Sequence, residues 1–212
     1  MSLAEPESGP DFTRIIANVT TQKARPRTAR NSIRIIGGVW RGRRIPFPDV
    51  PGLRPTPDRV RETLFNWVQP LLHGARCLDL FAGSGALGLE ALSRGAGETL
   101  FVDQSPLVAE NLREQLERLG ARNAASVHCR RAEAFLREPA APFDLVFLDP
   151  PFHGNLLPGI VELLVAGGWL VPGAHLYLEG ERTAEPPLPA GWQLLKSKLA
   201  GEVGYHLTRS SR

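Results

Sequence analysis

The tetrapeptide Asp149-Pro150-Pro151-Phe152 follows the apolar run 143–148 and offers the clearest chemistry in the sequence. Asp149 supplies a carboxylate and Pro150 a carbonyl, and both can accept hydrogen bonds from an exocyclic amine of a nucleobase. Such an amine is a poor nucleophile because its lone pair is delocalised into the ring, so it must be held while a methyl donor approaches. Phe152 offers a ring on which the base could stack. The same residues also fit a strand that ends in a Pro-Pro turn.

A glycine loop within residues 78–90 joins an apolar strand to a helix-like run. Gly83, Gly85 and Gly88 have G-x-G-x-x-G spacing, which permits a tight turn and lets backbone N–H groups approach a ligand. Phe81 and Ser84 belong to the same loop and are expected to contact the cofactor with it. The loop alone is weak evidence, because dinucleotide dehydrogenases share it.

Two acids beside this loop favour S-adenosylmethionine over a dinucleotide. Asp79 lies four residues before Gly83, where a carboxylate can meet the ammonium of an amino-acid moiety, a group that a dinucleotide lacks. Asp103 ends the apolar run 98–102, at the usual place for an acid that accepts hydrogen bonds from ribose hydroxyls.

From residue 75 onward, strand-like and helix-like patterns alternate, which predicts an α/β domain with a doubly wound, mostly parallel sheet. The expected strands are residues 75–80, 98–103, 125–129, 143–149, 174–179, 192–199 and 203–209, and the expected helices are residues 85–94, 105–119, 132–137 and 155–166. Ligands of such sheets bind beyond the carboxyl ends of the strands, where Asp79, Asp103 and Asp149 all fall.

The composition is typical of a globular enzyme, with 212 residues, 42% of them hydrophobic and 22% charged. Gly, Pro or charged residues break every apolar stretch well before the ~18 residues of a membrane span, so we expect a cytoplasmic protein without a membrane segment.

Cys77 and Cys129 are interpreted as core thiols, and no nucleophilic Cys stands in the tetrapeptide, which counts against cytosine C5 methylation. The histidines have no ligand spacing, so no metal is expected.

Positive charge is concentrated near the N-terminus. Residues 1–61 contain 12 Lys/Arg and 5 Asp/Glu, whereas residues 62–212 contain 13 and 17. Such a basic block favours binding to phosphate backbones, although a basic tail that only aids solubility would have the same composition. Residues 1–31, rich in Ser, Thr, Ala and Pro, are expected to form a disordered extension.

Residues 32–52 are interpreted as a basic hairpin that contacts RNA, ahead of a main domain at residues 53–212. Apolar runs on both sides of Gly37-Gly38 predict two short strands around a glycine turn, and a purely structural hairpin is the alternative. The arginines expected to project from the hairpin toward RNA are Arg34, Arg41, Arg43 and Arg44.

A helix with one apolar, core-facing side is expected next, with Thr56 as its N-cap and Pro57 at its first position. Arg54, Arg59 and Arg61 could face the substrate or could be ordinary surface arginines. Arg54 and Arg59 are retained as candidate RNA contacts.

Together, residues 33–40, residues 52–67, the glycine loop and the tetrapeptide resemble the RsmD family of bacterial 16S ribosomal RNA guanine-N2 methyltransferases. The resemblance covers about residues 33–209. It implies the seven-stranded, Rossmann-like fold of class I methyltransferases, with S-adenosylmethionine as methyl donor. The implied substrate is guanine 966 of 16S ribosomal RNA in the small ribosomal subunit or its assembly intermediate. Nothing in the sequence requires more than a monomer.

Carried over by motif, the resemblance assigns the cofactor to Asp79, Gly83, Gly85 and Asp103, and the guanine to residues 149–152. Relatives place an acid or amide before the alanine that contacts adenine, whereas this chain has Arg131 before Ala132. Both residues are included among the expected cofactor contacts.

Three other functions fit parts of the pattern. A DNA adenine-N6 or other nucleobase amino-methyltransferase would share the tetrapeptide and the loop. An NAD-dependent oxidoreductase would explain the loop and Asp103, but not Asp79 or the tetrapeptide. A ribosome-assembly protein without enzymatic activity would use only the basic segment.

Overall fold

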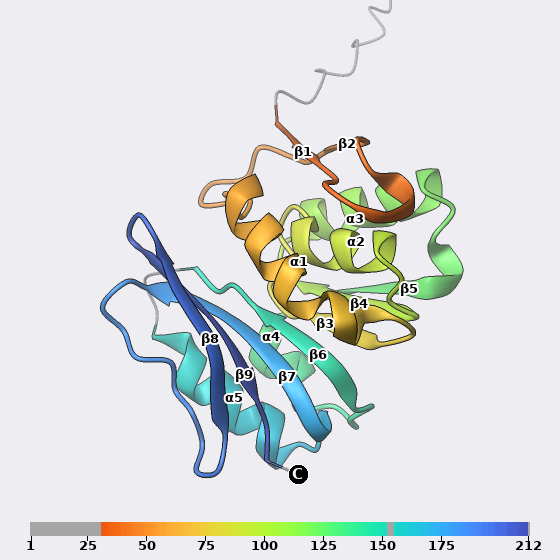
Figure 1. The fold of residues 1–212 in the computed structure, drawn as a ribbon. Helices are drawn as coiled ribbons and strands as arrows, with labels where there is room; N and C mark the ends of the chain where they lie inside the picture. The colour runs from red at the N-terminus through yellow and green to blue at the C-terminus, as the bar shows by residue number, and fades with distance from the viewer. Residues whose placement is uncertain (1–30, 152–154, 212) are drawn as a thin grey trace, which may run out of the picture.

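The computed structural model describes residues 31–151 and 155–211, and most of its strands form one seven-stranded sheet (Figure 1). The strands are β3 (Arg76–Asp79), β4 (Glu98–Asp103), β5 (Ala125–Cys129), β6 (Phe143–Leu148), β7 (Leu170–Glu181), β8 (Gln193–Ala200) and β9 (Val203–Arg209). Their order in space is β5-β4-β3-β6-β7-β9-β8. The first five run parallel, and β9 pairs antiparallel with both β7 and β8.

Helices cover both faces of the sheet, because the side chains of each inner strand alternate between two apolar faces. The helices are α1 (Asp58–Leu72), α2 (Ala86–Ser93), α3 (Pro106–Arg118), α4 (Ala132–Phe135) and α5 (Leu156–Ala166), with a 3-10 turn η3 (Arg122–Ala124). On β6, Phe147 packs in the cluster under α1, whereas Leu148 packs in the cluster under α4 and α5. The predicted doubly wound α/β fold is confirmed.

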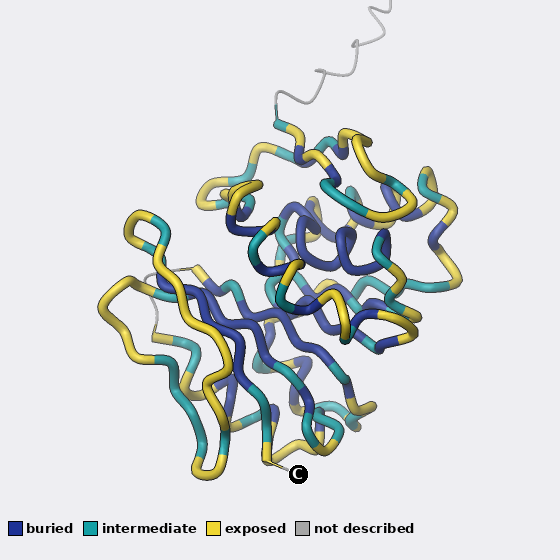
Figure 2. Tube along the Cα trace, in the orientation of Figure 1, coloured by how far each residue is buried: buried dark blue, intermediate teal, exposed yellow. Residues whose placement is uncertain are grey.

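The strands that line the middle of the sheet are buried, whereas β8 at its edge is exposed along nearly its whole length (Figure 2). β7 is longer than the expected residues 174–179, because its two ends pair with β6 and β9 respectively. No helix in the described part of the chain is long and apolar enough to cross a membrane.

The basic hairpin consists of β1 (Ser32–Arg34) and β2 (Arg44–Pro46), with a 3-10 turn η2 (Gly38–Trp40) between them. The second strand is shorter than the sequence suggested, because residues 38–40 turn against α2 instead. A Cβ on Gly38 would overlap the backbone of Ser93, and Gly38 has a φ of +74°. Ile35 and Ile45 pack in one hydrophobic cluster with residues of α2 and α3, so the hairpin shares its core with the main domain.

A buried ionic cluster also attaches the hairpin. Both carboxylate oxygens of Glu90, a fully buried residue of α2, accept backbone hydrogen bonds, from Ile36 N at 2.8 Å and Gly37 N at 2.7 Å. Arg94 and Arg61 form ion pairs with the same carboxylate, at 2.7 and 3.5 Å. The expectation that Arg61 is a surface or substrate-facing residue is wrong, since its side chain is fully buried and its guanidinium bonds Glu90, Asp58 and two backbone carbonyls.

Two further expectations are corrected. Thr56 does not cap α1, because the N-cap of this helix is Pro57, which makes no side-chain hydrogen bond there. The hydroxyl of Thr56 instead donates a hydrogen bond to Asp149. Cys77 is buried as expected, but Cys129 is exposed, because it ends β5, an edge strand whose only neighbour in the sheet is β4.

Candidate active site

The three predicted acids lie at the carboxyl ends of adjacent strands. Asp79 ends β3, Asp103 ends β4, and Asp149 directly follows β6. Because β3 lies between β4 and β6, the chain leaves β3 and β6 toward opposite sides of the sheet. In α/β sheets, ligands bind at a topological switch point of this kind, in the crevice beyond the carboxyl ends of the strands.

The glycine loop turns sharply over this crevice. Gly83 and Gly85 have φ values of +50° and +75°, a left-handed conformation that side chains disfavour. Gly83 N donates to Asp103 Oδ2 at 2.9 Å, so the loop is tied directly to the end of β4. Gly85 immediately precedes α2, whose N-terminal amides therefore begin at the crevice.

Gly88 has a packing role that the sequence did not distinguish from ligand binding. Its amide donates to Asp79 Oδ2 at 2.9 Å, and a Cβ at this position would collide with the ring of Phe101 on β4. Glycine therefore lets α2 lie close against the sheet. A cofactor contact of Gly88 stays a prediction.

Asp79 is buried, and two other acidic side chains lie near it. Its pKa is raised from 3.8 to about 7, chiefly by burial and also by the nearby charges of Asp149 and Asp103, while the hydrogen bond from the Gly88 amide opposes the rise. A cationic group placed beside Asp79 would relieve both the desolvation and the repulsion.

Asp103 is held by two backbone amides, Gly83 N on Oδ2 and Ser105 N on Oδ1 at 2.8 Å. Each carboxylate oxygen keeps a further lone pair, which suits ribose hydroxyls.

The remaining expected cofactor residues surround the same edge. Ser84 and Ala132 are buried and Phe81 is partly buried. Arg131 precedes α4 with an exposed side chain, 3.7 Å from Glu133. Their contacts with a cofactor stay predictions.

Asp149 is oriented by a residue far away in sequence. The Thr56 hydroxyl, just ahead of α1, donates to Asp149 Oδ2 at 3.1 Å. Burial raises the pKa of Asp149 to about 6, and the Thr56 hydrogen bond opposes this rise. Pro150 is buried and Pro151 is exposed, while Phe152 lies outside the described residues.

Sequence reasoning missed a second acid beside Asp149. Glu179, near the end of β7, is 3% exposed, and its Oε1 accepts the Tyr177 hydroxyl at 2.7 Å. The sequence does contain a pattern that could have identified Glu179. It is an acid near the carboxyl end of an apolar strand, as are Asp79, Asp103 and Asp149.

The candidate RNA-binding arginines lie on the hairpin, just before α1 and within α1. All of them are exposed: Arg34, Arg41, Arg43, Arg44, Arg54 and Arg59. Arg34 lies 3.6 Å from Asp58, with both side chains about half exposed, an arrangement that contributes little to stability.

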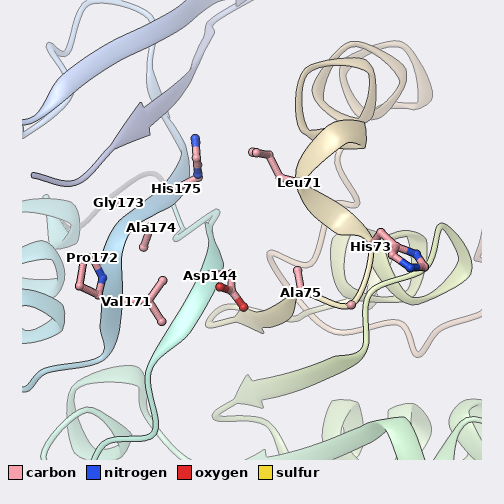
Figure 3. Close-up of a pocket in the computed structure, with 10 residues that line it drawn as sticks. Leu71, His73, Ala75, Asp144, Val171, Pro172, Gly173, Ala174 and His175 are labelled. Carbon is pink, nitrogen blue, oxygen red and sulfur yellow. The ribbon is translucent and has the colours of Figure 1, made fainter. Parts of the chain in front are cut away.

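An open cleft of about 330 Å³ occurs at the other end of the sheet (Figure 3). It is lined by residues that begin β6 and β7 or precede β3, such as Asp144, His175 and Ala75. Because the acids gather at the carboxyl ends of these strands, this cleft is separate from the candidate active site.

The strand order and the acid-lined switch point define the fold and site of class I methyltransferases. Consistent with this, a solved structure from Escherichia coli, described as a candidate methyltransferase, superimposes with a TM-score of 0.80 at 46% identity, covering 85% of this chain and 99% of that one.

Sequence comparison gives the family. A family model described as Conserved hypothetical protein 95 matches residues 33–209, so the chain belongs to that family, which is the RsmD family. The Ribosomal RNA small subunit methyltransferase D of Escherichia coli K12 is 51% identical over 82% of this chain and 88% of its own length. The protein of the same name in Haemophilus influenzae is 45% identical over 88% of this chain and 98% of its own.

Proposed function

We propose that this protein transfers a methyl group from S-adenosylmethionine to the exocyclic N2 amine of a guanine in 16S ribosomal RNA of the small ribosomal subunit. Membership of the RsmD family and the relatives named as small-subunit ribosomal RNA methyltransferases support the RNA substrate. The expected nucleotide is guanine 966, and the expected form of the substrate is the small-subunit particle or its assembly intermediate.

The observation that carries the cofactor assignment is the concentration of acids at the switch point. Asp79, Asp103 and Asp149 lie at the ends of three adjacent strands, and their mutual repulsion helps to raise the pKa of Asp79. S-adenosylmethionine carries an ammonium and a sulfonium, which such a site attracts. A dinucleotide carries an anionic pyrophosphate, which the same site repels. This distinction favours a methyltransferase over an NAD-dependent oxidoreductase.

Within this function the chain's own groups hold the base and orient its amine. When bound, the cofactor supplies an electrophilic methyl group on its sulfonium. The Asp149 carboxylate and the Pro150 carbonyl accept hydrogen bonds from the guanine amine, which fixes its position and direction. The guanine leaves its stack to reach this buried site. The proton released from the methylated amine passes to Asp149, whose pKa of about 6 suits a weak base near neutral pH.

The test is methyl transfer from labelled S-adenosylmethionine to small ribosomal subunits from a strain that lacks the modification, beside naked 16S RNA and duplex DNA. We expect label as N2-methylguanosine on the subunits. Label on DNA adenine, or no label on any RNA, would reject the proposal.

Asp149→Ala should lower turnover by at least about 100-fold, because an unheld amine loses its reactive orientation. Cofactor binding, measured by calorimetry, should persist. Glu114→Ala, which removes an exposed side chain on α3, is the control and should match the unsubstituted enzyme. Near-normal turnover of Asp149→Ala would remove Asp149 from the mechanism.

A further inference from the structure

Glu179 lies beside Asp149 on the neighbouring strand. The β6–β7 register pairs Phe147 with Tyr177 and Leu148 with Leu178. Paired residues of a parallel sheet project from the same face, so the next position places the side chains of Asp149 and Glu179 together. This is the face under α1, where Phe147 and Tyr177 pack.

A hydroxyl group donates a hydrogen bond to each of the two acids. Tyr177 Oη donates to Glu179 Oε1 at 2.7 Å, and Thr56 Oγ1 donates to Asp149 Oδ2 at 3.1 Å. The Thr56 hydroxyl also lies near enough to Glu179 to lower the pKa of that carboxyl. A hydroxyl has one proton and two lone pairs. If Thr56 gives its proton to Asp149, it can only accept a hydrogen bond from Glu179, which requires Glu179 to be protonated.

We propose that Glu179 is a positioning residue whose protonated carboxyl donates to Thr56, so that Thr56 donates to Asp149 and leaves Asp149 as the anion that holds the guanine amine. The inference rests on the proposed function and deepens it. No group in this chain is consumed: Glu179 keeps its proton through the reaction, and the proton released by the amine goes to Asp149.

The raised pKa values of Asp149 and Glu179 agree with this arrangement. The pKa of Glu179 is raised to about 8, chiefly by burial and then by the charge of Asp149, while the hydroxyls of Tyr177 and Thr56 oppose the rise. The pKa of Asp149 is raised only to about 6. Two adjacent carboxyls that cannot both ionise easily share one proton. We assign this proton to Glu179, because the Thr56 hydroxyl donates to Asp149 and so favours the ionised form of Asp149.

Other titratable or charged groups border the pair from each neighbouring element. Tyr205 on β9 pairs with Glu179, Asp79 at the end of β3 interacts with Asp149, and Arg61 of α1 donates to the Thr56 carbonyl. Saturation with cofactor should neutralise the influence of Asp79 in the experiment below, because the proposed function places the cofactor ammonium beside Asp79.

The experiment measures single-turnover methylation of small ribosomal subunits at saturating cofactor, from about pH 5 to about pH 10, a range that spans both pKa values. For the unsubstituted enzyme we expect the rate to rise through about pH 6 as Asp149 ionises and to fall through about pH 8 as Glu179 ionises. Glu179→Gln should keep the rise but lose the fall. Its amide can donate to Thr56 and accept from Tyr177 while being unable to ionise.

Two further variants separate positioning from a structural role. Tyr177→Phe removes a hydrogen bond that lowers the pKa of Glu179, so the alkaline fall should move to higher pH. Glu179→Leu cannot bond Thr56, and its rate between about pH 6 and about pH 8 should be about tenfold below that of the unsubstituted enzyme, the effect of one missing hydrogen bond. Calorimetric cofactor binding reports whether each variant is folded. If Glu179→Gln does not fold, the Tyr177→Phe profile decides.

An alkaline fall that is unchanged in Glu179→Gln, or in Tyr177→Phe when that variant decides, would overturn this inference while leaving the proposed function intact. An unsubstituted enzyme that makes no N2-methylguanosine on the subunits would overturn the proposed function itself.

Discussion

Asp79 shows how one buried side chain can make cofactor binding depend on pH. In the free protein its pKa is raised to about 7, chiefly by burial, so near neutral pH a fraction of the protein carries a neutral Asp79. We expect the cofactor ammonium to lie beside Asp79, where it would favour the ionised form and lower this pKa on binding. Binding below about pH 7 must therefore release a proton.

The affinity for S-adenosylmethionine should tighten as pH rises toward about 7 and then level off. Well below that pH the dissociation constant should change by up to about tenfold per pH unit. Isothermal titration calorimetry at several pH values, in two buffers of different ionisation enthalpy, measures both the affinity and the released proton. Asp79→Asn should bind weakly and without this pH dependence. An equally steep dependence in Asp79→Asn would assign the effect to another group.

At the scale of elements, the hairpin and α2 are joined by a buried carboxylate. Glu90 satisfies two hairpin amides and two arginines at once. Removing one partner of a buried ion pair leaves the others desolvated and unpaired, which is more costly than losing a surface pair.

Glu90→Ala should lower the free energy of unfolding by about 3–5 kcal/mol, because the buried Arg61 would lose one of its two carboxylate partners and Arg94 would lose its ion pair. Glu114→Ala breaks an exposed pair with Arg118 and should cost less than about 1 kcal/mol. Urea denaturation of both variants gives the comparison. Equal losses would show that the buried cluster contributes no more than a surface pair.

The hairpin also presents exposed arginines, and their role can be tested separately from the chemistry. Replacing Arg41, Arg43 and Arg44 together by Ala should weaken binding to small subunits. The slope of log affinity against log salt should fall by up to about 3, because each phosphate that an arginine no longer neutralises lowers it by roughly one.

The control replaces Lys196 and Lys198, which are exposed on β8, an edge strand of the sheet that lies away from the hairpin (Figure 1). Binding of both variants is measured by filter binding over a range of salt concentrations. A salt dependence that is the same in the arginine variant as in the unsubstituted protein would make the hairpin purely structural.

For the whole molecule, the acid cluster sets how stability depends on pH. The pKa values of Asp79, Asp149 and Glu179 are raised from 3.8, 3.8 and 4.5 to about 7, 6 and 8. Between the ordinary and the raised values the folded protein binds more protons than the unfolded chain, so the free energy of unfolding falls as pH rises.

We therefore expect the cofactor-free protein to lose stability between about pH 5 and about pH 8, by at most about 1.4 kcal/mol per pH unit for each group. Urea denaturation at a series of pH values measures this. Glu179→Gln should make the decline shallower, since a neutral amide does not titrate. A free energy of unfolding that stays level or rises over this range would contradict the proposed charge balance.

The sequence by itself determined the α/β class, the strand and helix positions, the glycine loop and the three acids at strand ends. These features depend on local patterns: apolar periodicity, glycine spacing and the position of a residue within its own element. Strands β4, β5 and β9 were predicted with their observed ends. Family membership followed from the same motifs.

Only the tertiary structure decided how distant segments complete the site. Thr56 was expected to cap α1, yet it bonds Asp149, 93 residues away. Arg61 was expected at the surface, yet it is buried against Glu90. Glu179 became a neighbour of Asp149 only because β7 pairs with β6. Such contacts depend on strand order and register, which bring together residues whose local sequence carries no sign of their partners.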